Sequence, residues 1–130
     1  MIKVAAGVIL REDGCVLLCS RPVDKPPAGW EFPGGKIEKG ETPGDALERE
    51  LLEELNLAGR SGKELVVVPT EKVELHFIRF FPAPGALIDP REGQEFRWQS
   101  TEDEMPEDLL PNDKPVWPLL MRLAGEELCR

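Results

Sequence analysis

One segment, residues 43–55, constrains the fold of this chain more than any other. It carries leucines at every fourth position, which form the apolar stripe of a helix with one buried face: Leu47, Leu51 and Leu55. Thr42 suits the capping position before the helix, Pro43 is favoured in the first turn, and Asp45 stands where a capping box places an acid. Asn56 tolerates the left-handed conformation that ends many helices. The sequence therefore predicts a helix over residues 43–55.

Three glutamates lie beside the leucine stripe on the same predicted helix. At about 100° per residue, Glu50, Glu53 and Glu54 fall within an arc of roughly 100°. Like charges at these spacings repel, and a cation between them would remove the repulsion. Oxygen ligands suit Mg²⁺ or Mn²⁺ better than zinc. A solvated acidic helix face is the alternative, in which Arg49 forms an ordinary surface ion pair with Glu53.

The rest of the hydrophobic pattern predicts mainly strands. They are expected at residues 4–10, 15–19, 30–32, 65–68, 73–81 and 95–99. Asp13-Gly14 predicts a hairpin turn, residues 34–40 a flexible turn, and residues 22–29, 82–91 and 100–111 loops. A final short helix over residues 115–123 is expected to end near Gly125. This order favours an α/β sandwich with helices packed on a curved mixed sheet.

Length, charge and cysteines narrow the class of protein. The 130 residues suit one domain, residues 1–130, and the absence of a long apolar run argues against a membrane span or a secretory signal. A net charge of −9 argues against binding to a nucleic acid polymer, but a divalent cation could bridge the chain to a small phosphorylated ligand. Cys15, Cys19 and Cys129 lack the spacing of a zinc site or disulfide framework, so we expect reduced thiols in a cytoplasmic protein.

A longer pattern surrounds the glutamate helix. It reads Gly35, five residues, Glu41, seven residues, Arg49-Glu50-Leu51, one residue, Glu53-Glu54, one residue, Asn56-Leu57. This pattern resembles the Nudix box of hydrolases that act on nucleoside diphosphates linked to another group, with Asn56 where that family usually has glycine. Flanking segments at 4–9, 29–36 and 110–116 are similar to the MutT-type branch. The resemblance covers most of the chain and implies a Nudix-like α/β/α sandwich, a curved mixed sheet with helices on both faces.

The resemblance implies a metal site on the helix. It makes the three glutamates the metal-facing carboxylates, with Glu54 the most direct ligand. The backbone carbonyl of Gly34 or Gly35 would complete the coordination shell. Glu41 and Arg49 would pair and fix the orientation of the ligand carboxylates.

The catalytic base is left open among several carboxylates. Glu50, Glu53 and Glu92 are the candidates for orienting the attacking water, and the resemblance gives Glu92 a place at the metal site as well. The alternative for Glu92 is an ordinary charge on a surface loop, and Glu95 is the fallback. A pH–rate profile and substitution at each position would separate them.

The resemblance also implies a pocket for the nucleotide. Its expected substrate-contacting residues are Ser20, Arg21, Glu31, Phe32, Pro33, Gly34, Asn112 and Asp113. Asn112 or Asp113 would read the base edge, and the asparagine of the familiar MutT pocket aligns with Asp113, which keeps a cytosine nucleotide open beside 8-oxoguanine. His76 is expected as a structural histidine, and Trp30, Trp98 and Trp117 as core residues rather than a stacking platform.

The leading hypothesis is a Mg²⁺-dependent nucleoside triphosphate pyrophosphohydrolase that releases a nucleoside monophosphate and pyrophosphate. Oxidised purine deoxynucleotides come first as substrates, in nucleotide-pool sanitation, and CTP or dCTP second; ADP-ribose or a dinucleoside polyphosphate is more distant. A catalytically silent nucleotide-binding module predicts lost box carboxylates, yet all three glutamates are present. A calcium-binding or acidic interaction protein predicts an EF-hand loop, which the sequence lacks. We expect a monomer or a homodimer without a membrane partner.

Overall fold

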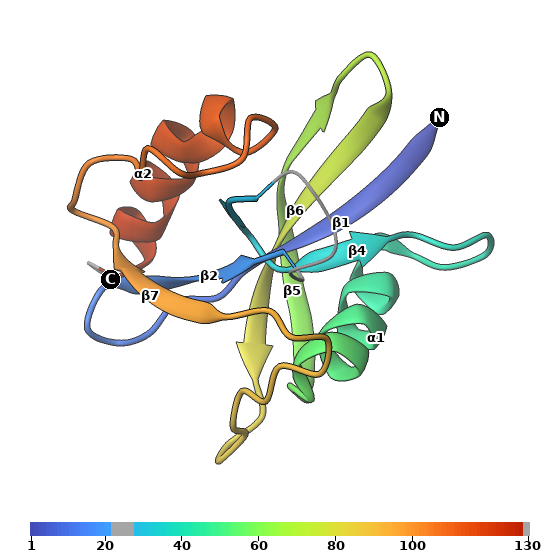
Figure 1. Ribbon diagram of the computed structural model, residues 1–130, viewed down its shortest axis with the longest axis horizontal. Helices are drawn as coiled ribbons and strands as arrows, with labels where there is room; N and C mark the ends of the chain where they lie inside the picture. The colour runs from blue at the N-terminus through green and yellow to red at the C-terminus, as the bar shows by residue number, and fades with distance from the viewer. Residues whose placement is uncertain (22–27, 129–130) are drawn as a thin grey trace.

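The computed structural model describes residues 1–21 and 28–128, which form two sheets and two α-helices (Figure 1). The first sheet has the order β4-β1-β6-β5 and contains β1 (Ile2–Val8), β4 (Gly34–Lys36), β5 (Gly59–Pro69) and β6 (Val73–Pro82). The second has the order β3-β2-β7 and contains β2 (Cys15–Ser20), β3 (Trp30–Glu31) and β7 (Phe96–Ser100). The helices are α1 (Pro43–Leu55), the 3₁₀ helix η1 (Lys114–Val116) and α2 (Trp117–Leu128). The first sheet is mixed, because β1 runs parallel to β6 and antiparallel to β4.

Alternation along the central strands places a helix on each face of the first sheet. Ala5 and Ile78 pack with the leucine stripe of α1, whereas Ala6 and Phe77 pack with Trp117 of α2. Successive side chains of a strand point to opposite faces, so α1 and α2 cover opposite sides (Figure 1). The predicted α/β sandwich with helices on both faces is confirmed.

Helix α1 begins and ends where the sequence predicts. The Thr42 hydroxyl accepts a hydrogen bond from the Asp45 N–H at 3.1 Å, which satisfies one of the free amides of the first turn. Asn56 has a φ of 52° and closes the helix in the left-handed conformation. The leucine stripe of α1 is fully buried against the first sheet. The direction of the glutamate face is therefore fixed by the packing of its neighbours.

One turn prediction needs correction, and the hairpin turn at Asp13-Gly14 is confirmed. Residues 34–36 are not part of a flexible turn but form β4, in which Gly35 pairs with Ala5 of β1. The turn before Cys15 forms, since the Gly14 N–H donates to the Arg11 carbonyl at 3.0 Å. The strands on either side of that turn nevertheless belong to different sheets. The chain crosses between the sheets just after β1, so the hairpin is only a short bridge between Leu10 and Val16.

Two element boundaries differ from the prediction by more than two residues. β5 starts at Gly59 rather than at residue 65, because the polar residues there extend the antiparallel pairing with β6 across two register shifts. α2 continues through Gly125 to residue 128. A helical glycine costs only about 1 kcal/mol relative to alanine, which packing elsewhere in α2 offsets. Residues 22–27, most of one predicted loop, and Cys129 lie outside the described residues.

The histidine, tryptophans and cysteines that were expected to be structural lie in or beside the core, or are free thiols. His76 is buried in β6 with its Nε2 atom 2.7 Å from Glu74 Oε1. Trp117 lies in the core, and the other two tryptophans pack against its edges. Cys15 and Cys19 are free thiols. Within the part of the chain that the structure describes, no helix has the length and apolar character that crossing a membrane requires.

Candidate active site

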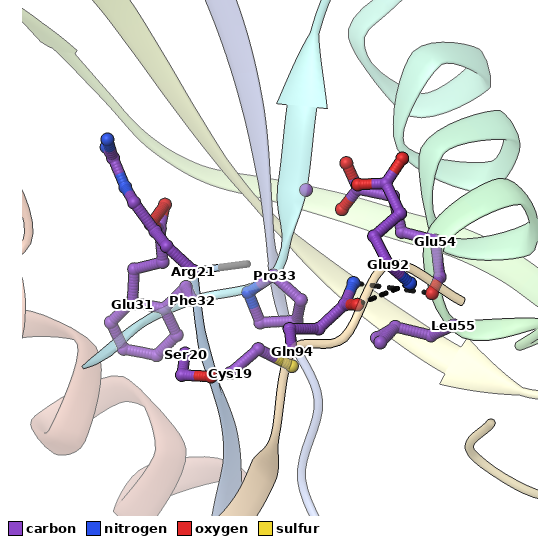
Figure 2. A pocket seen from close by; sticks show the side chains of 11 residues that line it. Cys19, Ser20, Arg21, Glu31, Phe32, Pro33, Glu54, Leu55, Glu92 and Gln94 are labelled. Carbon is purple, nitrogen blue, oxygen red and sulfur yellow. Dashed lines mark hydrogen bonds and ion pairs between the residues drawn. The ribbon is translucent and has the colours of Figure 1, made fainter. Parts of the chain in front are cut away.

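A cleft with two ends lies beside β3 and β4, and its two parts share Arg21, Glu31, Phe32 and Gly34. We call the part that also contains Glu54 and Glu92 the carboxylate end; its volume is about 170 Å³. The part that also contains Asn112 and Asp113 is the loop end, with a volume of about 410 Å³. Figure 2 shows the side chains of the carboxylate end. The shared residues make the two ends one continuous candidate site.

At the carboxylate end, negative charge is concentrated around Glu54. Its carboxyl group lies beside that of Glu92 (Figure 2), and both line the same pocket. Burial, together with the nearby charges of Glu50 and Glu92, raises the pKa of Glu54 from 4.5 to about 8. Without a cation, Glu54 therefore holds a proton at neutral pH. A bound cation would favour the ionised form instead.

Glu50 packs closely against β4 because Gly35 has no side chain there. Its side chain is 14% exposed. A Cβ atom at Gly35 would overlap the Glu50 carboxyl group. Because Gly35 pairs with Ala5 of β1, the backbone that faces Glu50 cannot move away freely. The glycine thus lets a carboxylate and a backbone strand approach closely.

Arg49 links Glu50 to the loop before α1. Its Nε and Nη2 atoms donate to both carboxylate oxygens of Glu41, at 2.8 and 2.9 Å. Its Nη1 atom donates to Glu50 at 3.0 Å. Arg49, assisted by the Glu38 N–H, lowers the pKa of Glu41 to about 2. The expected pair of Glu41 and Arg49 therefore forms, and the further role of orienting metal ligands stays a prediction.

Glu53 does not join the other two glutamates. Its side chain is 59% exposed, it accepts a hydrogen bond from Arg49 at 3.3 Å, and it lines neither end of the cleft. The reason is helical geometry, since Glu53 lies farthest from the buried leucine stripe and Glu54 nearest to it. The prediction that all three carboxylates converge is therefore wrong for Glu53. The roles of Glu53 as metal ligand and base stay predictions.

The carboxylate end fits a hard divalent cation that binds with help from its substrate. Across residues 1–21 and 28–128, no three acidic, histidine or cysteine side chains form a complete metal cage. Mg²⁺ commonly binds through one or two carboxylates together with substrate phosphates and water. Glu54 supplies one such carboxylate, and Glu50, which lines neither end of the cleft but whose charge acts on Glu54, supplies the second.

The loop end is dominated by the buried Asp113. Its side chain accepts a hydrogen bond from the Phe32 N–H at 2.9 Å, and only 6% of the residue is exposed. Burial raises the pKa of Asp113 to about 7, although the Phe32 N–H opposes that rise. Asn112 lines the same end and is exposed. The structure thus brings both predicted base-reading residues to the cleft.

The other expected substrate contacts are spread along the cleft. Arg21 and Glu31 lie where the two ends meet and form an ion pair of 2.8 Å. Phe32 lines both ends but is almost entirely buried, edge-on to Phe77. Pro33 and Gly34 border the carboxylate end.

Two predictions about the neighbouring strands change. Ser20, expected among the substrate contacts, lines the carboxylate end and not the loop end that holds Asn112 and Asp113. Its hydroxyl accepts a hydrogen bond from the Glu95 N–H at 2.8 Å, which fixes the start of β7. Glu95 is exposed and lines neither end, so the structure gives the fallback base no support. Glu92 is the loop carboxylate that reaches the cleft.

Sequence reasoning missed three residues of the carboxylate end: Cys19, Leu55 and Gln94. Burial raises the pKa of the Cys19 thiol to about 12, so it stays protonated. Gln94 is a buried polar residue. Its only signal in the sequence is a polar side chain two positions after Glu92, which does not reveal a contact with α1.

Comparison with known proteins identifies the family. The NUDIX domain model matches residues 1–120, and the chain belongs to this family. The CTP pyrophosphohydrolase of Escherichia coli K12 is 37% identical over 130 residues, covering 96% of this chain and 95% of that protein. The 8-oxo-dGTP diphosphatase of the same strain is 32% identical, covering 94% and 98%. The solution structure of the E. coli ORF135 protein has a TM-score of 0.82 and 35% identity, covering 97% of this chain and 92% of that one.

These relatives confirm the resemblance to MutT-type Nudix enzymes that the box residues predict. Nudix hydrolases generally need a divalent metal, which agrees with the carboxylate end. The relatives align over nearly their full lengths, so the likeness extends beyond the box to both ends of the cleft.

Proposed function

We propose that this chain hydrolyses nucleoside triphosphates to nucleoside monophosphates and pyrophosphate with Mg²⁺. The observation that carries the proposal is one continuous cleft with acidic, cation-seeking residues at one end and a buried carboxyl group at the other. The names of the two E. coli relatives support the same reaction class. Mn²⁺ is the alternative ion, because it accepts the same oxygen ligands.

In this proposal the triphosphate lies toward the carboxylate end. Mg²⁺ bound there supplies the positive charge that lets acidic side chains and phosphates share one site. Glu50 and Glu54, with the backbone of Gly34 or Gly35, hold that ion. Glu92, beside Glu54, is the preferred candidate for orienting the attacking water. Arg49 and Glu41 keep Glu50 in place from outside the cleft.

The base lies toward the loop end, where Asp113 sets the hydrogen bonding. A protonated carboxyl both donates and accepts, which matches the N3 and N4 positions of cytosine. An ionised carboxylate only accepts, which matches the N1–H and N2–H edge of an oxidised guanine. A pKa of about 7 makes both forms accessible near neutral pH. CTP-type and 8-oxo-dGTP-type nucleotides are therefore the two substrate classes to compare, and a preference for the second would support a role in nucleotide-pool sanitation.

The test is pyrophosphate release from a panel of nucleotides with Mg²⁺, with Mn²⁺ and with EDTA. The panel contains CTP, dCTP, dGTP, 8-oxo-dGTP and ADP-ribose, and kcat/KM is measured at pH 6 and pH 8. We expect metal-dependent release of pyrophosphate from at least one triphosphate. ADP-ribose hydrolysis yields AMP and ribose 5-phosphate rather than pyrophosphate, so AMP formation is followed by chromatography for that compound. Turnover of ADP-ribose alone would replace the proposed substrate class. No hydrolysis of any nucleotide, with tight nucleotide binding, would identify a silent binding module.

A further inference from the structure

The side-chain amide of Gln94 connects the two elements that carry the acidic residues of the carboxylate end. Its Oε1 atom accepts a hydrogen bond from the Glu92 N–H at 2.8 Å. Its Nε2 atom donates to the backbone carbonyl of Glu54 at 3.3 Å. Figure 2 shows both bonds beside the neighbouring carboxyl groups of Glu54 and Glu92. One side chain thus holds the loop of Glu92 against the last turn of α1.

The last turn of α1 is well suited to such a contact. The final carbonyls of a helix have no partner within the helix, so they accept hydrogen bonds from outside. The Arg91 N–H also donates to the Glu54 carbonyl, and the Asp89 N–H donates to that of Leu55, both at 2.8 Å. The loop before β7 is therefore seated on the C-terminal end of α1. Gln94 is the side chain that extends this contact to Glu92 itself.

The chain around Gln94 is fixed on its other side as well. Gly93 has a φ of 79°, a left-handed conformation in which a residue with a side chain is strained. After Gln94, the backbone of Glu95 exchanges two hydrogen bonds with Ser20 at the end of β2. Gln94 is only 7% exposed between these anchors. Its amide therefore has one arrangement in which both of its bonds form.

We propose that Gln94 is a positioning residue that sets the place of the Glu92 carboxylate relative to Glu54. The inference rests on the proposed function, in which Glu92 acts at the carboxylate end. An amide supplies the acceptor for Glu92 and the donor for Glu54 together at every pH. Glutamate at this position keeps an acceptor but loses the donor, and methionine of similar length loses both.

A double-mutant cycle tests whether Gln94 acts through Glu92. The variants are Gln94→Met, Glu92→Gln and the double variant, assayed for kcat and KM with a triphosphate that the wild type hydrolyses. Displacing a reacting group by about 1 Å can cost ~100-fold, so we expect Gln94→Met to lower kcat at least ~10-fold with KM changed less than ~3-fold. In the Glu92→Gln background the same change should alter kcat less than ~3-fold. Losses that multiply in the double variant would overturn the proposal.

A second variant and a control separate positioning from folding. Gln94→Glu keeps one hydrogen bond, so we expect it to fold and to lose kcat to an intermediate extent; unchanged kcat in it would overturn the proposal. Ser61→Ala removes a hydrogen bond of 2.7 Å to Glu48 on the side of α1 that faces β5, and should leave kcat unchanged. A wild type without pyrophosphate release would refute the proposed function. An active wild type with full activity in Glu92→Gln would refute only the role of Gln94.

Discussion

The two ends of the cleft are built in different ways. The carboxylate end depends on one stretch of chain, residues 35–54, in which Arg49 donates hydrogen bonds of 3.0 Å or less to Glu41 and Glu50. The loop end joins Phe32 to Asp113 through a single hydrogen bond between distant segments. The carboxylate end is therefore specified by local spacing, whereas the loop end depends on how α2 and its preceding loop pack. Substitutions should accordingly affect turnover at the first end and substrate choice at the second.

Glu54→Gln should give the largest effect, because it removes the carboxylate that lines the carboxylate end beside both Glu50 and Glu92. Losing an electrostatic contact to developing charge costs ~100- to 1,000-fold in kcat, and we expect a fall of that order. Thermal unfolding at pH 8 should show an unchanged or higher Tm, since glutamine carries no charge to bury. The measurement is pyrophosphate release under saturating Mg²⁺. A kcat within threefold of the wild type would contradict the assignment of Glu54.

Gly35→Ala should give the next largest loss, because a Cβ atom there overlaps the Glu50 carboxyl group. Glu50 must then turn away from β4, and we expect kcat to fall ~10- to 100-fold and the Mg²⁺ requirement to increase. Gly125→Ala is the matched control, since nothing lies within 4 Å of its added Cβ atom. That control should keep wild-type kcat and gain up to about 1 kcal/mol of stability. Normal Mg²⁺ activation in Gly35→Ala would show that Glu50 does not hold the ion.

The sequence predicts the features that local spacing sets and misses those that tertiary packing sets. The bounds of α1 were predictable, because Thr42 and Asn56 act on residues of the same helix. β4 was not, because a strand of two glycines and a lysine has no hydrophobic alternation, and its pairing with β1 creates it. The difference between Glu53 and Glu54 was predictable in part, because helical geometry places Glu53 farther than Glu54 from the leucine stripe that packs on the sheet.

The loop before β7 shows the same limit. The family resemblance was enough to propose Glu92. That Glu92 and not Glu95 reaches the cleft depends on the hydrogen bonds between the backbone of Glu95 and Ser20. Gln94 was missed because its partners, the Glu92 N–H and the Glu54 carbonyl, are backbone groups that no residue pattern marks. Local motifs therefore predicted which residues carry charge, and tertiary contacts decided which of them meet.

Arg49→Lys should cause a moderate loss that leaves the fold intact. Lysine keeps the positive charge but cannot bridge Glu41 and Glu50 with the planar fork of arginine. We expect kcat to fall roughly 5- to 20-fold while KM for the nucleotide stays nearly constant, because the ligands are less well oriented. Steady-state kinetics and Mg²⁺ titration measure both. A change in KM alone would place Arg49 in substrate binding instead.

Asp113→Asn should have the smallest effect on kcat and should sharpen the contrast between the two ends. Asparagine still offers an oxygen to the Phe32 N–H but carries no charge. The folded-state pKa of Asp113, about 7, lies above its ordinary 3.8, so the folded protein holds this proton more tightly than the unfolded chain. Its contribution to the free energy of unfolding is therefore present below pH 3.8 and is lost as the pH rises to about 7. The Tm of the variant should exceed that of the wild type at pH 8, by several degrees more than at pH 5.

The pH profile of substrate choice completes this test, because an amide can donate and accept at every pH. In the wild type, ionisation of Asp113 should change the ratio of kcat/KM for CTP to that for 8-oxo-dGTP between pH 6 and pH 8. In Asp113→Asn that ratio should be nearly independent of pH, while kcat keeps the pH dependence that Glu54 imposes. Glu54 is present in both proteins, so its raised pKa cancels in the difference between their Tm values. An equal Tm difference at pH 5 and pH 8, or an unchanged pH profile of the ratio, would show that Asp113 does not titrate in the cleft and that the loop end selects its base by shape alone.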